Sequence, residues 1–324
     1  MWSAIFSRVI FGLLMATAAI GWAQPALAGT FPEKPVTLIV SWPAGGGTDV
    51  SRRAAAKFAE GPLGHAIVVV NKPGGGGVVG TLEVERVRPD AYTLLVCTST
   101  TVVTQDVGNV HNDIKKLTPI AYYAMDAAAV TVRADAPWKT LKDFVEYAKA
   151  NPGKLRNANS PAGGTSQIAA SIFEKGTGTK LIQVPYGGFA PSVAALLGGH
   201  VDSTTVPVSD VAKHHQEGTL RVLAVMADKR HYLVPNVPTL KELAIDLAYG
   251  VWYGICAPAA TPPAIVAVLE RAFLKGWEHA EFKAFMEKSG WVLAPMGAKD
   301  TAALFENEDR RIHALLKEMG LTTK

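Results

Sequence analysis

The chain has 324 residues, of which 48% are hydrophobic and 19% are charged, so it carries ample apolar material for a buried core and intrinsic disorder is excluded as its main state. Its 30 glycines and 20 prolines follow no Gly-X-Y period, which excludes collagen. The formal net charge is +4 without a cluster of Lys and Arg, so no nucleic-acid partner is expected.

Residues 1–28 have the three-part form of a secretory signal peptide. Arg8 is their one ionisable side chain, Val9–Ala23 is apolar apart from Thr17, and small residues precede an expected cleavage site after Ala28. A membrane anchor is the alternative, but an apolar run of about 15 residues is short for a span that needs about 20. We therefore expect an exported, soluble mature chain.

The two cysteines, Cys97 and Cys256, would then reside in an oxidising compartment that permits a disulfide. Both lie in apolar, strand-like runs, YTLLVC and VWYGICAP. Their spacing does not distinguish a disulfide from two buried thiols, and buried thiols are the preferred interpretation.

Strands and helices alternate along the mature chain. A β-α-β-α-β order over 36–96 predicts a parallel sheet with helices on its faces, and an extended apolar stretch follows at 120–132. The pattern begins again over 141–226, which indicates a second α/β lobe. The part from Thr261 onward is expected to be mainly helical, with Pro262 and Pro263 in a first helical turn.

Three turns share one construction, in which small residues join a strand to a helix: 43–49, 161–166 and 186–191. The first amide groups of a helix lack intrahelical partners and carry partial positive charge, and glycines let a ligand approach them, so such turns suit a carboxylate, phosphate or sulfate. A purely connecting role is the alternative. Two alike turns in different lobes favour binding, and capping is the preferred role for Asp49.

Other motifs carry little chemistry. The run Gly75-x-Gly77-x-x-Gly80 matches the dinucleotide fingerprint formally, but it lacks the acidic residue about 20 positions later that binds ribose. Phosphate-binding lysine loops, zinc-protease motifs and nucleophile elbows are absent from the sequence. The adjacent His214 and His215 indicate a surface helix end and not a metal site. We therefore expect no catalytic residue, cofactor or metal.

Several segments, in this order, strongly resemble the Bug/TctC family of extracytoplasmic solute receptors. They are FPEKPVTLIVSWPAGGGTDVSRR, VVVNKPGGGGVVG, AGGTSQIAA, VPYGGFAPSVAALLGGHVD and WYGICAPAATPPAIV. The resemblance implies an α/β, two-lobed type II periplasmic binding protein fold, with each lobe a mainly parallel sheet flanked by helices and a cleft between the lobes. Lobe 1 is expected to comprise 29–124 and 226–324, and lobe 2 to comprise 125–225.

In relatives, glycine-rich loops of both lobes hold one ligand carboxylate. Carried onto this chain, the ligand-binding residues of the first lobe are expected to be Trp42, Ala44, Gly45, Gly46, Gly47, Thr48, Asp49, Thr98 and Ser99. Those of the second lobe are expected to be Ala162, Gly163, Gly164, Thr165, Ser166, Tyr186, Gly187, Gly188 and Asp202, and a structural role is the alternative for Asp202.

Some positions depart from the family pattern, among them Trp42, Gly187 and the pair Val206-Pro207. A larger aromatic wall and an apolar far end favour an aromatic or apolar carboxylic acid over an amino acid. The expected function is therefore a periplasmic, monomeric receptor that delivers a small carboxylate to the membrane permease subunits of a tripartite tricarboxylate transporter. A receptor that serves a sensor kinase, and an exported hydrolase or isomerase, are the alternatives.

Overall fold

The computed structural model describes residues 31–44, 47–107, 110–160, 163–318 and 320–323. The expected signal peptide, 1–28, lies outside the described residues, as do Gly45, Gly46 and Ala162 of the glycine-rich turns. Within the described ranges, the structure has no helix whose length and apolar character suit a membrane span.

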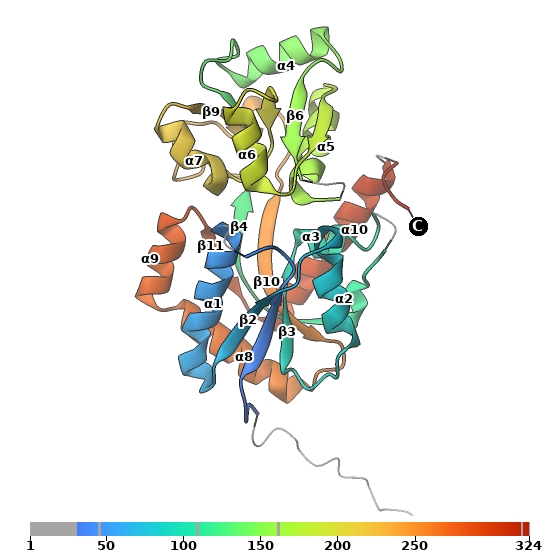
Figure 1. Cartoon of the computed structure of the whole chain (residues 1–324), viewed down its shortest axis with the longest axis vertical. Helices are drawn as coiled ribbons and strands as arrows, with labels where there is room; N and C mark the ends of the chain where they lie inside the picture. The colour runs from blue at the N-terminus through green and yellow to red at the C-terminus, as the bar shows by residue number, and fades with distance from the viewer. Residues whose placement is uncertain (1–30, 45–46, 108–109, 161–162, 319, 324) are drawn as a thin grey trace, which may run out of the picture. The chain divides into compact units, whose positions relative to one another are not determined.

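Two sheets with flanking helices form the two lobes (Figure 1). The first sheet has the strand order β11-β4-β10-β3-β1-β2. Its strands are β1 (Val36–Val40), β2 (Ile67–Asn71), β3 (Thr93–Thr98), β4 (Leu117–Ala127), β10 (Gly250–Pro258) and β11 (Val292–Met296). The second sheet has the order β7-β6-β8-β5-β9. Its strands are β5 (Ala129–Arg133), β6 (Arg156–Asn159), β7 (Ile182–Pro185), β8 (Ser203–Thr204) and β9 (Leu220–Val225).

Helices from three parts of the chain cover the two sheets. Those of the first lobe are α1 (Gly47–Leu63), α2 (Val78–Arg86), α3 (Ser99–Val103), α8 (Pro263–Trp277), α9 (Ala280–Lys288) and α10 (Ala298–Glu318). Those of the second lobe are α4 (Leu141–Ala150), α5 (Thr165–Thr177), α6 (Phe189–Leu197) and α7 (Val208–Gln216). Short 3-10 turns occur at η2 (Gly75–Gly77), η3 (Ile114–Lys116) and η4 (Lys241–Leu243).

Strand direction follows from the path of the chain. β1 pairs in parallel with β2 and β3, as the alternating pattern predicts, and β6 pairs in parallel with β7 and β8. β10 is antiparallel to both β3 and β4, and β5 is antiparallel to β8 and β9. Each sheet is therefore mixed, because the chain enters or leaves the lobe along its antiparallel strands.

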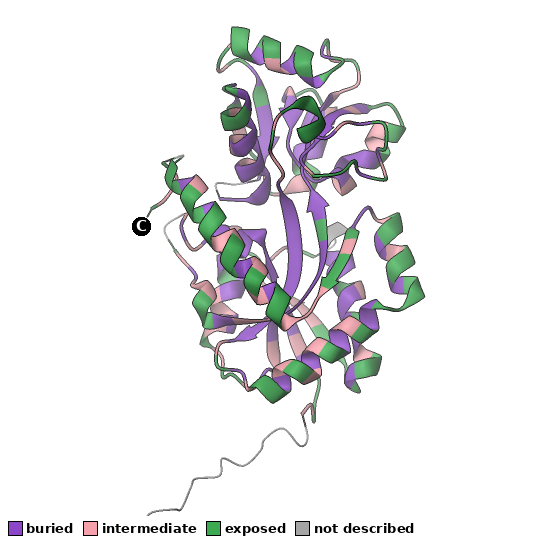
Figure 2. Cartoon of the chain, turned by 180° about the vertical axis from the view of Figure 1, so that it is seen from behind, coloured by how far each residue is buried: buried purple, intermediate pink, exposed green. Residues whose placement is uncertain are grey.

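The connection between the lobes runs through long, buried strands. All nine residues of β10 are buried, so this strand forms the centre of the first lobe (Figure 2). β4 extends to Ala127 and β5 begins at Ala129. The lobe boundary expected after residue 124 thus falls within β4, and the one expected after residue 225 falls at the end of β9.

The cysteine interpretation as free thiols is wrong, because Cys97 and Cys256 form a disulfide. β3 and β10 are adjacent in the sheet, with Cys97 opposite Gly254 and Cys256 opposite Leu95. This register leaves the two Cα atoms 6.0 Å apart, although 159 residues separate them in sequence. That Cα distance is in the range a disulfide requires.

The glycine run after β2 serves close packing. A Cβ atom added at Gly80 would lie 2.5 Å from Ser41 Oγ and 3.1 Å from both Ile39 Cγ2 and the Lys72 carbonyl oxygen. Gly80 therefore lets α2 approach β1 directly. Such helix–strand contact is one of the functions that glycine has in fingerprint motifs generally, and it needs no nucleotide.

Candidate functional site

A cavity of about 380 Å³ lies between residues of the two lobes. The first lobe contributes the segment between β1 and α1, the end of β3 with α3, and the start of β10. The second lobe contributes the segment between β6 and α5, the start of α6, and the first turn of α7. Its volume suits a small organic molecule.

Threonines at the end of β3 bring hydroxyl groups to this cavity. Thr98 is the N-cap of α3: its side chain accepts a hydrogen bond from the Thr100 amide, and its own amide donates to Thr101 Oγ1. This capping box fixes the turn of the chain, so the Thr98 and Thr100 side chains line the cavity.

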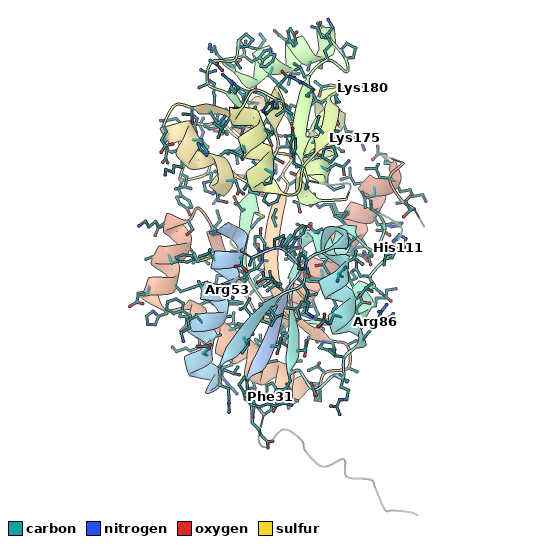
Figure 3. All side chains as sticks on the ribbon, viewed as in Figure 1. Phe31, Arg53, Arg86, His111, Lys175 and Lys180 are labelled. Carbon is teal, nitrogen blue, oxygen red and sulfur yellow. A yellow bond between two sulfur atoms is a disulfide. The ribbon has the colours of Figure 1, made fainter. Side chains whose placement is uncertain are left out.

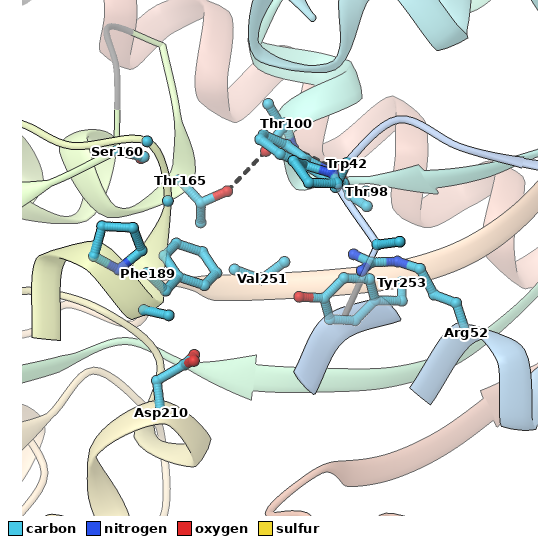
Figure 4. Close-up of a pocket in the computed structure, with 16 residues that line it drawn as sticks. Trp42, Arg52, Thr98, Thr100, Ser160, Thr165, Phe189, Asp210, Val251 and Tyr253 are labelled. Atoms are coloured by element: carbon cyan, nitrogen blue, oxygen red, sulfur yellow. Dashed lines mark hydrogen bonds between the residues drawn. The ribbon is translucent and has the colours of Figure 1, made fainter. Parts of the chain in front are cut away.

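Arg52 brings a guanidinium group to the cavity from α1, although its side chain is almost completely buried, with 1% exposed. Its guanidinium carbon lies 4.5 Å from the centre of the Tyr253 ring, a cation–π contact (Figure 4). Its Nε and Nη1 atoms make no hydrogen bond with any residue in the described part of the chain. A buried cation in this state is stabilised by an anion that reaches it.

The neighbouring Arg53 has a different environment, because successive helical residues point in different directions. Figure 3 labels Arg53 on this helix. Its Nε donates to Asp49 Oδ2 at 2.9 Å and its Nη2 donates to Asn71 Oδ1 at 2.6 Å. Asn71 in turn donates to the Trp42 carbonyl oxygen at 2.9 Å and to Asp49 Oδ1 at 2.8 Å. These residues hold the segment before α1 in position, with Trp42 lining the cavity.

Tyr253 lies under Arg52 and stacks on Tyr123, with ring centres 6.0 Å apart. Burial raises the pKa of Tyr123 to about 12 and that of Tyr253 well above its usual value, while Arg52 partly opposes both shifts. Both phenols therefore keep their protons near neutral pH and leave the positive charge of Arg52 uncompensated.

The start of α5 brings the two lobes into direct contact. Thr165 Oγ1 lies 2.8 Å from Thr100 Oγ1, the bond drawn in Figure 4, and 3.4 Å from Ser99 Oγ. Gly163 has a φ of 78°, and a Cβ atom added there would lie 3.1 Å from Val107 Cγ1. Hydroxyl groups and a close backbone approach thus join the lobes beside the cavity.

The remaining wall is apolar apart from one acid. Phe189, Ala190 and Pro191 line the cavity from α6, after Gly187 and Gly188. Asp210, in the first turn of α7, lines the cavity beside them. Burial raises its pKa from the usual value to about 7.

Six of the residues predicted from the sequence line the cavity: Trp42, Ala44, Thr98, Thr165, Gly187 and Gly188. Ser99 is not among these six, but its Oγ lies 3.4 Å from Oγ1 of the lining residue Thr165. Gly47 and Thr48 belong to the first turn of α1, and Gly163 and Gly164 precede α5. The cavity wall therefore includes residues from both of the alike turns or their flanks.

Other predicted residues have bonds that explain their positions differently. Ser166 Oγ accepts a hydrogen bond from the Ser160 amide at 2.7 Å. Asp202 accepts one from the Arg156 amide at 2.8 Å, which ties β6 to the segment before β8. Asp49 bonds Arg53 and Asn71 as described above, and Tyr186 is not among the described lining residues. The side chains of Ser166, Asp202 and Asp49 therefore support the local fold of the two lobes.

Sequence reasoning did not single out Arg52, Phe189, Asp210, Val251 or Tyr253, which also line the cavity. A signal for Arg52 existed, because two adjacent arginines at the start of an amphipathic helix point in different directions, so one of them faces the protein. In the described ranges, no group of three or more His, Cys, Asp or Glu side chains is arranged to hold a metal ion.

The chain matches the model of the tripartite tricarboxylate transporter family receptor, TctC, over residues 50–321. It is 33% identical to a Cupriavidus necator protein described as "UPF0065 protein in gbd 5'region", over 96% of each chain. Among solved structures, it is similar to R. palustris Rpa4515 with adipate, with 25% identity, a TM-score of 0.82 and coverage of 90% of this chain and 99% of that one.

A second structure, MatC (Rpa3494) from Rhodopseudomonas palustris with bound malate, is also 25% identical, with a TM-score of 0.80 and coverage of 88% of this chain and 100% of that one. The family match and the relative span nearly the whole described chain, and the similar structures share its two-lobed α/β fold. The chain belongs to the TctC family of tripartite tricarboxylate transporter receptors.

Proposed function

We propose that the protein is a receptor that captures a small carboxylate in the cavity between its lobes. The observation that carries this proposal is the guanidinium of Arg52, which is buried, faces the cavity, and has no ion-pair partner among the described residues. Charge-assisted hydrogen bonds between a guanidinium and a carboxylate are among the strongest polar contacts in proteins. A carboxylate therefore supplies what this side chain lacks.

Hydroxyl groups add neutral donors for the same ligand. Thr98, Thr100, Ser160 and Thr165 line the cavity together with Arg52, and Thr165 begins α5, where the helix amides carry partial positive charge. The proposed grip by the amides of both glycine-rich turns is consistent with this arrangement. The similar structures that hold adipate and malate support the carboxylate assignment.

The walls suit an apolar ligand body. Trp42, Phe189, Pro191 and Val251 surround the polar groups with aromatic and aliphatic surface. Burial of an aromatic or aliphatic chain against such a wall stabilises a complex by about 25 cal/mol per Å² of apolar surface removed from water. We propose an aromatic or aliphatic carboxylic acid as the ligand, in preference to an amino acid.

Ligand capture is proposed to close the lobes. Lobe 1 would comprise 29–124 and 226–324, and lobe 2 would comprise 125–225, with hinges near 123–127 and 225–228. A ligand that contacts both Arg52 and Thr165 favours the closed state because only that state offers both contacts. The bond between Thr100 and Thr165 acts in the same direction.

The proposed setting is the periplasm, where the closed receptor acts as a monomer and delivers its ligand to membrane permease subunits. Family membership supports this role, since the family is described as transporter receptors. We also propose that the protein is a receptor and not an enzyme, and that residues 1–28 direct its export. A receptor that serves a sensor kinase would use the same binding step.

Isothermal titration calorimetry with benzoate, adipate, malate and glutamate tests the proposal. We expect at least one of the first three to bind at micromolar concentration or below, about 8 kcal/mol of binding free energy, and to raise the melting temperature. Benzamide and benzyl alcohol, which lack the charge, serve as controls and should not bind. Binding of glutamate alone would contradict the ligand class, and equal binding of benzoate and benzamide would contradict the role of Arg52.

A further inference from the structure

Asp210 places a carboxyl group in the wall of the cavity that is proposed to hold an anion. It lies in the first turn of α7 and lines the cavity, and its side chain makes no hydrogen bond with any residue in the described ranges. Figure 4 shows it reaching into the pocket from the opposite side to Arg52. Ionised, it would place a negative charge in the chamber that the ligand's charge must enter.

The elements around Asp210 offer it little positive charge. From β4 it faces Asp126, which is fully buried, and from β10 it faces the phenol of Tyr253, with Arg52 of α1 beyond that ring. The residues that α6 contributes to the cavity are apolar, and on α7 itself Lys213 is exposed and paired with Glu217.

The segment after β9 brings two further titratable groups near Asp126 and α7, and burial keeps both uncharged near neutral pH. Burial lowers the pKa of His231, whose Nε2 donates a hydrogen bond to the Gly290 carbonyl oxygen at 3.1 Å. Burial also raises the pKa of Tyr232 to about 12, with a further contribution from Asp126. Neither group stabilises an ionised Asp210.

Burial acts on the two acids in the same direction. It raises the pKa of Asp210 to about 7, and it raises the pKa of Asp126 well above its usual range, where the nearby Asp210 adds to the shift and Ser209 opposes it. Two carboxyl groups that share a low-dielectric site disfavour each other's ionisation. The pocket at slightly acidic pH thus combines a charged Arg52 with neutral acids.

We propose that Asp210 selects the charge of the ligand: with its proton it donates a hydrogen bond to an acceptor on the anionic ligand, and without its proton it repels that ligand. This inference rests on the proposed function. The ligand class becomes narrower, namely a carboxylate that offers Asp210 a hydrogen-bond acceptor and carries no ammonium group. An ammonium ligand would instead favour the ionised acid.

When the carboxylate binds, an ionised Asp210 takes up one proton from solvent, and an Asp210 that is already protonated retains its proton. When Asp210 loses that proton, the complex weakens. For one group that titrates near pH 7, the dissociation constant rises about tenfold between pH 6 and pH 8. Benzoate and adipate carry carboxyl groups with ordinary pKa values well below this range, so their own ionisation contributes little to the change.

Calorimetry with benzoate and adipate at pH 6, 7 and 8 tests the inference on the wild type, Asp210→Asn and Glu217→Gln. We expect about tenfold weaker binding at pH 8 than at pH 6 for the wild type and for Glu217→Gln, an exposed acid on the same helix. Asp210→Asn, which still donates a hydrogen bond, should bind with nearly the same affinity at all three pH values. Repeating the titration at pH 7 in buffers with different ionisation enthalpies should reveal net proton uptake for the wild type and none for Asp210→Asn.

The outcomes separate the inference from the function on which it rests. If neither probe binds the wild type or Asp210→Asn at pH 6, the proposed capture of such carboxylates is overturned and this inference with it. If a probe binds with the same pH slope in wild type and Asp210→Asn, or binds more tightly as pH rises, only the inference is overturned. Ligand-free melting curves of Asp210→Asn, expected to match or exceed the wild type at pH 8, verify that the variant is folded.

Discussion

Arg52 and Asp210 face one cavity from different lobes, and burial affects them in different ways. The guanidinium of Arg52 keeps its charge in a buried position because its intrinsic pKa is too high for deprotonation. The carboxyl group of Asp210 becomes neutral near pH 7, because burial raises its pKa to about 7. The first lobe thus contributes a permanent positive charge, and the second lobe contributes a carboxyl group whose charge depends on pH. We therefore assign attraction of the anion to Arg52 and pH-dependent selection of the ligand to Asp210.

Removal of the permanent charge of Arg52 is expected to have the largest effect on binding. We expect Arg52→Gln to weaken the binding of benzoate or adipate about a hundredfold, close to 3 kcal/mol, because a charge-assisted hydrogen bond is lost. Titration calorimetry measures the loss. The melting temperature without ligand should stay equal or rise, because a buried and unpaired charge has been removed.

Lys57→Gln is the matched control, because Lys57 lies on the same helix with an exposed side chain. It should leave the affinity unchanged. A melting temperature that falls by many degrees in Arg52→Gln, with unaltered affinity, would assign Arg52 to the fold and not to the ligand.

The apolar part of the second wall is expected to contribute less than the charge. Phe189→Ala removes an aromatic ring from the cavity, and we expect about tenfold weaker binding of benzoate, near 1.5 kcal/mol. The same variant should bind malate, which has a smaller apolar surface, with a smaller loss. Calorimetry with both acids gives the ratio of the two losses in affinity.

Ile182→Ala, an exposed apolar residue on β7 of the same lobe, provides the comparison variant and should bind as the wild type does. Equal losses for benzoate and malate in Phe189→Ala would refute a role for Phe189 in selecting apolar acids.

The smallest expected effect concerns the hydrogen bond between the two lobes. Thr165→Val keeps the side-chain shape but removes the hydroxyl that bonds Thr100 at 2.8 Å and approaches Ser99 at 3.4 Å. We expect about fivefold weaker binding, near 1 kcal/mol, because the closed state loses a hydrogen bond. Small-angle X-ray scattering of the ligand-free variant should show a larger radius of gyration.

Ser171→Ala on the same helix serves as the reference substitution. The double variant Thr100→Val/Thr165→Val sharpens the test, because the two changes should be non-additive if they remove one shared bond. Fully additive losses would argue against a direct inter-lobe bond in solution.

Much of the fold followed from local patterns in the sequence. Runs of β-branched residues such as Val36–Val40 predicted the parallel strands, and small residues after strands predicted where helices begin. The pairing of β10 between β3 and β4 was not predictable in this way, because it joins segments more than 120 residues apart. Strand β11 was also missed, since Val292–Met296 is a short strand within a region of helical pattern.

The candidate site was predictable to the extent that it lies in strand-to-helix turns. Trp42, Thr98 and Thr165 were expected there and line the cavity. Arg52 and Tyr253 were not expected, because the inward direction of a helical residue and the neighbour of a central strand depend on tertiary packing. The disulfide was missed for the same reason, since the distance between Cys97 and Cys256 depends on sheet order.

The disulfide joins β3, in the part of the chain that precedes the second lobe, to β10, in the part that follows it, so strands β5–β9 all lie within the covalent ring that it closes. The second lobe is in effect a long insertion whose two stems are tied together at their base. Local unfolding of that insertion would leave the two halves of the first lobe covalently connected. This connection favours re-formation of the cavity when the insertion refolds. A protein produced in a reducing cytosol would lack this tether.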